Sequence, residues 1–347
     1  MKIDKRAQLG DRIINLKATG QSEGVLADGG YTISDELVPS VLAPNFAEGS
    51  LYSDCNIFNV GPNSNTLKIP VSNETTRSSS TIKGGIRAYI VGEAATKTAS
   101  QGTFDLLILP LKKATTVVYV TDELLQDNVG MASYVSKVQK EATLALVDYN
   151  IVYGDGSLCN GIASSTATGF SAISSPITAG ELKDIFDKYY GGKNGKWYLS
   201  KDIFNEITDL YETASAGSIH LIATVNGWML WGMPVVISDV LLDRTILLAD
   251  LTQYALAQKD IVEDINRSLK WVEDETCLRT VFRVNGGALW KTPITLADGS
   301  VVYPFVMDSG HDNNSSSSSS TSYVKNWSSS SSSSSSTESS SSSSSSM

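Results

Sequence analysis

The sequence contains few of the residues that most active sites and metal sites use, with three cysteines and two histidines among 347 residues. Cys55, Cys159 and Cys277 are widely spaced and form no CxxC pair, so we expect buried free thiols in a reducing compartment. A Ser-His-Asp triad would depend on His220, because His311 lies beside a serine-rich tail. The segment around His220 is typical of a loop that enters a strand. We therefore predict no catalytic residue, no metal site and no cofactor.

Long apolar runs are also missing from the sequence. No uninterrupted apolar stretch approaches the ~20 residues that a membrane span requires, so we predict no membrane partner. The first residues are polar and mixed in charge, without the apolar core of a secretion signal. The formal net charge is -10, which argues against a protein that grips nucleic acid through its phosphates. A container that merely encloses nucleic acid stays compatible with this charge.

The most informative part of the sequence runs from residue 104 to residue 162. Residues 104–109 alternate in strand fashion, and a β-branched and aromatic run follows at 115–120, so we expect strands in both places. The motif TDELLQD comes next, and Thr121 or Asp122 can cap a short helix there.

A long amphipathic helix is predicted over residues 131–153. Its apolar residues recur at intervals of three and four, which places them in one stripe. The stripe consists of residues 131, 134, 135, 138, 142, 145, 146, 149 and 152. Roughly 22 residues at a rise of 1.5 Å give a rod about 33 Å long. We expect Gly154 and Gly156 to end the helix, because glycine adopts the left-handed C-cap conformation without penalty.

The remaining segments mix helix and strand patterns, so we assign the chain to the α+β class. Residues 71–102 are rich in Ser, Thr, Gly and Lys, and they form a long excursion between two strand-like arms. Long loops of this kind are usually functional or mobile. Helices are predicted at 179–190 and 201–214 around a strand at 197–200, and strand patterns dominate residues 251–306.

The chain becomes almost entirely serine from Asn313, with runs at 315–320, 328–336 and 339–346. Such a segment has little to bury and cannot offset its chain entropy, so we expect it to be disordered. Two interpretations stay open for this tail. It is either a flexible segment displayed on a surface or a tolerated extension without a selected role.

A series of short motifs follows the chain between residues 28 and 306. They are Gly29-Gly30-Tyr31, Glu36-Leu37-Val38-Pro39, Leu67-Lys68-Ile69-Pro70, Gly92-Glu93, Thr121-Asp122-Glu123-Leu124-Leu125, Asn150 through Gly156, Asn160-Gly161-Ile162, Gly232-Met233-Pro234-Val235-Val236-Ile237-Ser238, Ala249-Asp250-Leu251-Thr252-Gln253-Tyr254 and Phe282-Arg283-Val284. Each motif is weak alone. In this order and spacing they resemble the major capsid proteins of tailed bacteriophages, the family with the Hong Kong 97-like capsid fold.

The resemblance implies a division of the chain into arm, loop and two domains. The expected parts are an N-terminal arm at 1–50, an extended loop with its flanking strands at 51–105, a peripheral domain at 106–169 with the spine helix at 131–153, an axial domain at 170–250, return strands of the peripheral domain at 251–310, and a disordered Ser-rich tail at 311–347.

Some members of this family crosslink their shells, when a lysine of the extended loop attacks an asparagine of a neighbouring subunit with the help of a glutamate. By resemblance, Lys97 occupies the place of that lysine. Asp274 stands where the asparagine would be, and Val281 replaces the glutamate. Because two of the three parts are changed, we expect an ordinary surface lysine and a shell without isopeptide bonds. The candidate residues for contacts between subunits are Arg87, Glu93, Lys97 and Asp274.

The resemblance thus implies a non-enzymatic major capsid protein that self-assembles into pentamers and hexamers of an icosahedral shell, is assembled in the host cytoplasm and resides in the virion. The implied partners are a scaffolding protein, a portal, decoration proteins and packaged double-stranded DNA that is enclosed without sequence-specific binding. One alternative is the shell subunit of an encapsulin compartment, which the excursion and the long N-terminal arm disfavour. The other is a surface-layer or adhesin protein with a Ser-rich stalk, which would predict a secretion signal.

Overall fold

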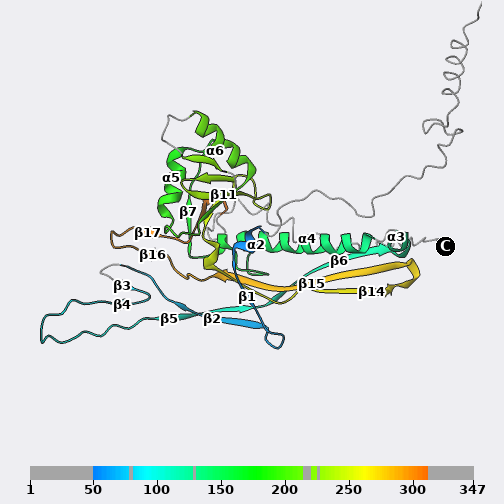
Figure 1. Cartoon of the computed structure of the whole chain (residues 1–347), viewed down its shortest axis with the longest axis horizontal. Helices are drawn as coiled ribbons and strands as arrows, with labels where there is room; N and C mark the ends of the chain where they lie inside the picture. The colour runs from blue at the N-terminus through cyan, green and yellow to red at the C-terminus, as the bar shows by residue number, and fades with distance from the viewer. Residues whose placement is uncertain (1–49, 78–80, 128–129, 214–219, 225–226, 312–347) are drawn as a thin grey trace, which may run out of the picture.

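The computed structural model describes residues 50–77, 81–127, 130–213, 220–224 and 227–311 (Figure 1). The predicted N-terminal arm and the predicted serine tail lie almost entirely outside these ranges. Helices and strands are mixed within them, which confirms the predicted α+β class.

A long five-stranded sheet forms the extended part of the molecule. Its strands are ordered β1-β13-β15-β14, and β6 also pairs with β15. The strands are β1 Asn56–Asn59, β6 Lys112–Thr121, β13 Tyr254–Gln258, β14 Val262–Lys270 and β15 Glu275–Ala288. β15 is the central element, because one part of it pairs with β13 and the other part pairs with both β6 and β14.

The helix α4, Met131–Tyr153, runs along one face of this sheet and matches the predicted span (Figure 1). The short helix α3, Asp122–Asp127, precedes it, and the Asp122 carboxylate accepts a hydrogen bond from Thr276 of β15. The short helix α2, Ser50–Asp54, packs beside the second half of α4, where the N–H of Tyr52 donates to Asp148 Oδ1 at 2.8 Å. The two short helices thereby tie α4 to the surrounding elements at both ends.

The buried face of α4 differs in part from the predicted apolar stripe. Gln139 and Thr143 are 2% and 1% exposed although both are polar, whereas Val138 is 37% exposed. Burial of Gln139 is possible because its carboxamide has two hydrogen-bond partners. It donates to the carbonyl of Leu278 at 3.0 Å and accepts from Thr280 Oγ1 at 3.0 Å. The prediction is wrong at these positions because the spacing of apolar residues does not reveal a buried polar group whose partners come from another element.

The end of α4 also differs from the prediction. Gly154 is the C-cap with φ -57° and ψ 134°, so the predicted left-handed conformation is wrong for this residue. Glycine is needed there for space, because a Cβ would lie 2.4 Å from the backbone oxygens of both Asn150 and Cys159. The left-handed turn comes later, at Gly156, whose φ is +89°.

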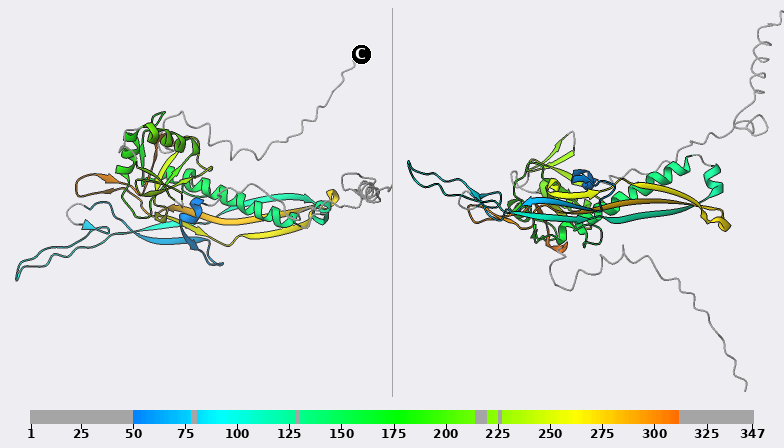
Figure 2. Two further views of the ribbon diagram at one scale, coloured as in Figure 1. Left: turned by 45° about the horizontal axis from the view of Figure 1, so that its top comes forward. Right: turned by 90° about the horizontal axis from the view of Figure 1, so that it is seen from below.

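A seven-stranded sheet with two helices forms the compact part of the molecule (Figures 1 and 2). Its strand order is β7-β18-β12-β8-β11-β10-β9. The elements are β7 Thr168–Ser171, α5 Ala179–Lys188, β8 Lys196–Leu199, α6 Lys201–Thr213, β9 Leu221–Thr224, β10 Gly227–Leu230, β11 Met233–Ile237, β12 Ile246–Ala249 and β18 Phe305–Asp308. The two predicted helices and the strand between them are therefore confirmed, with slightly different ends.

The last strand of this sheet corrects part of the predicted division. β18 lies within the segment 251–310, which we expected to return to the peripheral domain, yet it pairs with β12 and β7. All four of its residues are buried. A strand that is buried on both faces lacks the alternation that would indicate its place. The other predicted boundaries stay predictions.

The two sheets share one apolar core. Tyr198 and Phe305 of the seven-stranded sheet belong to the same buried cluster as Tyr254 and Phe282 of the five-stranded sheet, and Ile151 of α4 is also part of it. A second cluster around Trp197 fills the space between the seven-stranded sheet and the helices α5 and α6. The shared cluster makes the two parts one continuous body.

A narrow β-ribbon leads out of this body into the excursion. The remaining strands are β2 Thr66–Ser72, β3 Thr81–Ile82, β4 Ile86–Arg87, β5 Phe104–Pro110, β16 Ile294–Thr295 and β17 Val301–Val302. The 3-10 helices are η4 Ile162–Ser164, η5 Leu251–Gln253, η6 Trp271–Glu273 and η7 Ser309–His311. β2 pairs with β5, and the chain between them projects far from the sheets (Figure 1).

Candidate functional site

The most exposed large apolar side chains lie toward two opposite ends of the molecule. On the excursion and its ribbon, Ile90 and Phe104 are 107% and 77% exposed. At the turn between β14 and β15, Trp271 and Val272 are 79% and 94% exposed. The excursion and this turn point in opposite directions in all views (Figures 1 and 2). Exposed apolar groups of this kind mark sites of protein contact.

The ribbon of β2 and β5 has two apolar faces. The inner face packs on the five-stranded sheet, where Leu109 is fully buried beside Ala255 and Ala257. The outer face presents Phe104, Leu106 and Ile108 to solvent. The alternation that predicts a strand at 104–109 is confirmed, but it places one apolar row inward and the other outward. A second apolar row on a solvent-facing ribbon indicates a surface that another molecule covers.

The base of the excursion is attached to the body by polar contacts. Lys291 Nζ lies 2.6 Å from Asp105 Oδ2, and this ammonium group holds the pKa of the carboxyl below its ordinary value. The N–H of Thr295 donates to the carbonyl of Thr75 at 3.0 Å, and the N–H of Arg77 donates back to Thr295 at 2.8 Å. A groove of about 620 Å³ lies between the ribbon and the body at this level. The base is therefore fixed, and the tip projects beyond it.

The tip of the excursion lies between β4 and β5. The Arg87 guanidinium lies over the ring of Tyr89, 5.3 Å from its centroid, and the backbone of Arg87 exchanges two hydrogen bonds of 3.1 Å with Ser100 Oγ. Glu93 and Lys97 lie farther along and are exposed. These contacts hold the two arms of the tip together while Ile90 stays in solvent.

One face of the five-stranded sheet is only partly covered. α4 packs against the face that carries Val120 and Leu278, and the ribbon covers part of the opposite face near β13. On the rest of that opposite face, Val117 of β6 is 46% exposed and Tyr119 is 47% exposed. Because a sheet face with exposed β-branched and aromatic residues is unusual beside solvent, this area is a second candidate contact surface.

The turn between β14 and β15 is held in one shape by Lys270. Its ammonium group lies 2.6 Å from Glu273 and 2.8 Å from Glu275, and it also lies over the ring of Tyr119 at 4.6 Å. The carboxylates of Glu273 and Glu275 raise the pKa of Lys270 above its ordinary value, and Glu273 has the larger effect. Asp274 closes the turn with a φ of 49°. These contacts fix the shape of the turn, which holds Trp271 and Val272 at the surface.

The predicted contact residues fall into two separate places. Arg87, Glu93 and Lys97 belong to the excursion, and Asp274 belongs to the opposite end of the molecule (Figure 1). Within one chain they do not meet. Val281 lies in β15, paired with Thr115 and Val262. Any contact between Lys97 and Asp274 would therefore join two copies of the chain.

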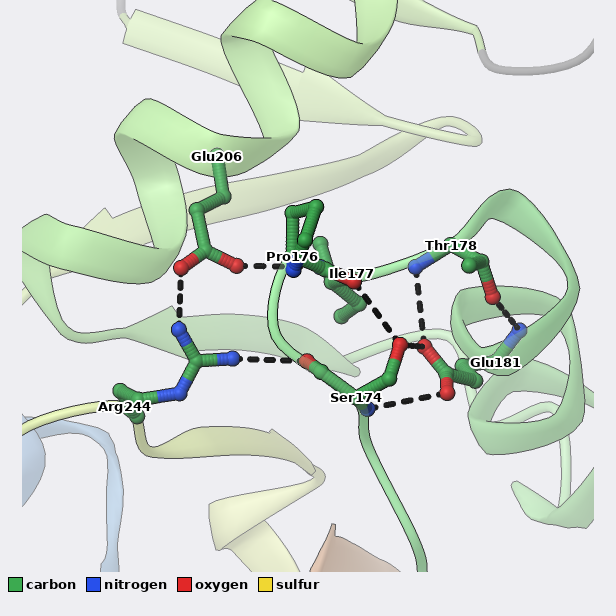
Figure 3. A network of polar contacts seen from close by, with 7 residues as sticks. All are labelled: Ser174, Pro176, Ile177, Thr178, Glu181, Glu206 and Arg244. Carbon is green, nitrogen blue, oxygen red and sulfur yellow. Dashed lines mark hydrogen bonds and ion pairs between the residues drawn. The ribbon is translucent and has the colours of Figure 1, made fainter.

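Polar side chains stiffen one end of the compact part (Figure 3). Arg244 pairs with Glu206 of α6 and donates to the carbonyl of Ser174 at 2.7 Å. The second oxygen of Glu206 accepts from the N–H of Ile177 at 3.0 Å, and Glu181 of α5 accepts from the N–H of Ser174 at 2.9 Å. Two carboxylates therefore fix the loop before α5, which indicates a rigid support rather than a reactive site.

The three cysteines and His220 are the candidate residues for chemistry that the structure describes. The three cysteines are free and buried, and burial raises the pKa of Cys159 to about 12. His220 is exposed, immediately before β9, and its carbonyl accepts from the N–H of Trp231. Within the described ranges, no three acidic, His or Cys side chains gather as metal ligands, and none of the helices is long and apolar enough to cross a membrane.

The sequence analysis did not identify the exposed apolar residues at the two ends of the molecule. Ile90 and Val91 stand in a serine- and glycine-rich excursion, and Trp271 and Val272 stand between Lys270 and three acidic residues. Adjacent large apolar residues in otherwise polar turns are the signal that could have identified them.

Comparisons with known proteins agree with this architecture. The model of the phage capsid family matches residues 29–299. The structure resembles the capsid of an empty GTA particle with a TM-score of 0.63 at 13% identity, covering 83% of this chain and 98% of that one. It also resembles a chain of Microbacterium phage Oxtober96, with a TM-score of 0.58 at 13% identity over 83% of this chain and 99% of that one.

A chain of Mycobacterium phage Adephagia is similar at a TM-score of 0.55 and 15% identity, covering 81% of this chain and 96% of that one. No curated protein sequence matches significantly. At these identities the structural likeness shows the fold, and the family match spans most of the sequence. The chain therefore belongs to the phage capsid family, as a major capsid protein with the Hong Kong 97-like fold.

Proposed function

We propose that this capsid protein assembles head to tail into pentamers and hexamers that close into an icosahedral shell, and that its role is structural rather than enzymatic. The observation that carries the proposal is the placement of exposed apolar side chains at opposite ends of an elongated molecule (Figure 1). Surfaces at opposite ends form head-to-tail contacts, and such contacts close into rings when the rotation between neighbours allows it.

The excursion and ribbon of one copy would cover the exposed sheet face of the next. The outer row of the ribbon, with Phe104 and Ile108 exposed, offers one apolar surface, and Val117 and Tyr119 offer the other. Burying a large apolar side chain contributes about 1.5–3 kcal/mol, whereas an exposed ion pair contributes about 0–1 kcal/mol. The apolar rows would therefore supply most of the contact energy between neighbours.

We propose that the shell encloses double-stranded DNA without sequence-specific binding. The net charge of -10 supports enclosure, because tight binding to phosphates requires clustered basic side chains. A scaffolding protein, a portal and decoration proteins are the further partners that the family resemblance implies, with assembly in the host cytoplasm. The rigid body formed by α4 and the shared core supports a subunit that keeps its shape within such an assembly.

Expression of the chain together with the scaffolding protein of its phage tests this function. Sedimentation velocity should show particles far larger than a 37.1 kDa monomer, and electron microscopy should show closed shells. Particles from infected cells should hold nuclease-protected DNA. A monomer as the sole species across salt concentrations, with scaffolding protein present, would contradict the proposal.

A further inference from the structure

The two long edge strands of the five-stranded sheet differ in how their open edges are protected. β6 and β14 lie on opposite sides of β15 (Figure 1). Each pairs with β15 and, among the strands that the structure describes, with no other. An open edge presents unpaired backbone groups to other chains, and proteins usually block such edges with charged side chains, prolines or bulges.

β14 carries this protection, and β6 does not. The pairing of β14 is irregular between Asn266 and Lys270. Its charged residues are Glu263, Asp264, Arg267 and Lys270. β6 pairs with β15 in one unbroken register, and its residues 114–121 include no charge and no proline. Every residue of β6 after Ala114 is β-branched or aromatic, which favours strand pairing. The open edge of β6 is therefore suited to accept another strand.

The helix above this edge is also uncovered on the same side. Gln139 contacts β15, and Lys140 contacts Glu263 of β14 at 2.6 Å. Because successive helix residues are about 100° apart, Val138 and Ala142 lie on the opposite flank of α4, above β6. Val138 is 37% exposed, and Ala142 is exposed as well. The open strand edge thus lies next to an open helix flank.

The charges at the two ends of β6 make the strand complementary to itself. Lys113 lies at its start and Glu123 follows its end, and both side chains are exposed. Two antiparallel copies of β6 that are centred on Val118 place Lys113 of each copy beside the first turn of α3 in the other, which carries Glu123. A parallel arrangement would instead place Lys113 beside Lys113. Opposite charges therefore favour the antiparallel order.

The uncharged part of β6 fits the same register. Val117 then lies opposite Tyr119 of the second copy, and Thr115 lies opposite Thr121. Pairs of aromatic with β-branched residues and pairs of threonines both stabilise neighbouring antiparallel strands. Side chains and backbone thus agree on one arrangement of the two copies.

We propose that β6 of one copy pairs with β6 of a second copy about a two-fold axis normal to the sheet, so that one sheet runs through both copies. This inference rests on the proposed shell function and names a contact between subunits of neighbouring rings. Head-to-tail contacts close a ring, whereas a two-fold contact uses the same surface on both copies and can join two rings. An axis normal to the sheet keeps both α4 helices on one side, where Val138 and Ala142 of the two copies approach each other.

Cysteine pairing in assembled particles tests this contact. A variant with Thr115→Cys and Thr121→Cys carries two thiols at exposed positions. Cys277→Ser is added, because Cys277 lies diagonally across from Thr121 on the same face of the sheet. Mild oxidation should give a band at twice the monomer mass on denaturing gels without reductant. No larger species should form, because a two-fold contact joins only two copies.

The two single variants in the same Cys277→Ser background are the controls for register. In the proposed pairing, the thiols of two Thr115→Cys copies lie about 20 Å apart, because six residues separate position 115 from position 121. The same holds for two Thr121→Cys copies. A mixture of the single variants should therefore give about ten times more dimer than either variant alone.

The other outcomes separate this contact from the shell function. A dimer from Thr115→Cys alone would contradict the antiparallel register. A ladder up to pentamers and hexamers from the double variant would reveal a head-to-tail contact at this edge and overturn the two-fold pairing. Closed particles without any band would overturn it as well, while leaving the shell function intact. If the wild-type chain forms no particles at all, the shell function fails and the pairing fails with it.

Exchange of the two charges gives an independent measurement. Lys113→Glu and Glu123→Lys should each raise the protein concentration required for assembly about five-fold. A chain with both changes should return to within about two-fold of the wild type, because the ion pairs form again with reversed sign. Lys113→Glu is compatible with the fold, since Arg283 lies opposite position 113 in β15.

Lys183→Glu is the control for the charge change itself, since Lys183 is exposed on α5 of the compact part. It should shift the assembly concentration less than about two-fold. Melting temperatures within a few degrees of the wild type exclude misfolding of the variants. A double variant that assembles no better than the single variants would contradict the pairing of Lys113 with Glu123.

Discussion

Thr280 Oγ1 of β15 donates a hydrogen bond to Gln139 Oε1 of α4 at 3.0 Å. The same carboxamide donates to the carbonyl of Leu278 at 3.0 Å, and its side chain is almost completely buried. Apolar contacts alone would leave α4 free to rotate or slide on the sheet, because they have no direction. Two directed bonds from one side chain fix both the rotation of the helix and its position along the central strand.

The Gln139→Ala variant should be destabilised by about 2–4 kcal/mol, because Thr280 and the Leu278 carbonyl would lose partners inside the protein. Lys137→Ala is the control on the same helix, since Lys137 is 69% exposed and pairs with Glu141 at 3.5 Å. Its effect should stay below about 0.5 kcal/mol. Chemical denaturation followed by circular dichroism measures both. Equal stability of the two variants would show that the buried carboxamide does not hold the helix.

A proline in the middle of α4 should prevent shell formation. Ala142 is exposed, so Ala142→Pro introduces no clash with the core, but it removes a backbone hydrogen bond and costs about 3 kcal/mol or more. Ala142→Ser keeps the bond and should cost about 0.5 kcal/mol. Sedimentation of co-expressed protein with its scaffolding protein distinguishes them. Normal shells from the proline variant would mean that a continuous α4 is not required.

The Gly154→Ala variant should be strongly destabilised although the backbone of Gly154 is not left-handed. The added Cβ would lie 2.4 Å from two backbone oxygens that belong to α4 and to the turn after it. We expect a loss of about 3 kcal/mol, typical of an overpacked core. Gly61→Ala is the matched control, because nothing lies within 4 Å of a Cβ there. Melting curves that coincide for the two variants would refute the close packing of this turn.

The sequence indicates the helices better than it indicates their environment. The span of α4 follows from three-and-four spacing and from the glycines beyond it, because both signals are local. The buried face of α4 could not be predicted, since the partners of Gln139 lie on β15, far away in the chain. The pairing of β18 with β12 and β7 could not be predicted for the same reason, because a fully buried strand shows no alternation that would indicate its neighbours. The exposure of Trp271 likewise depends on the turn that presents it.

Removal of the serine tail should leave assembly unchanged. Truncation after His311 keeps η7 and retains Asp308, whose carboxylate accepts from the N–H of Ile246 at 3.1 Å. The removed residues are mostly serine and offer little apolar surface to bury. Electron microscopy of the truncated protein, expressed with its scaffolding protein, should show shells of normal size. Loss of shells would mean that the tail takes part in the structure.

The mature shell should contain no isopeptide bonds between subunits. Such a bond needs an amine, a carboxamide and a proton-shuttling base. Lys97 can supply the amine, but Asp274 offers a carboxylate, which is a poor electrophile, and Val281 cannot act as a base. Boiled and reduced mature particles should run as one band near the monomer mass on a denaturing gel. A ladder of larger species that disappears in Lys97→Ala particles would contradict this expectation.

The most direct test of head-to-tail assembly is a cryo-electron microscopy reconstruction of closed particles. The reconstruction should show pentamers and hexamers in which the excursion of each subunit extends across the exposed sheet face of a neighbour, so that Phe104 and Tyr119 are buried between copies. A shell in which the excursions point into solvent and the faces of β6 and β15 stay bare would contradict the account.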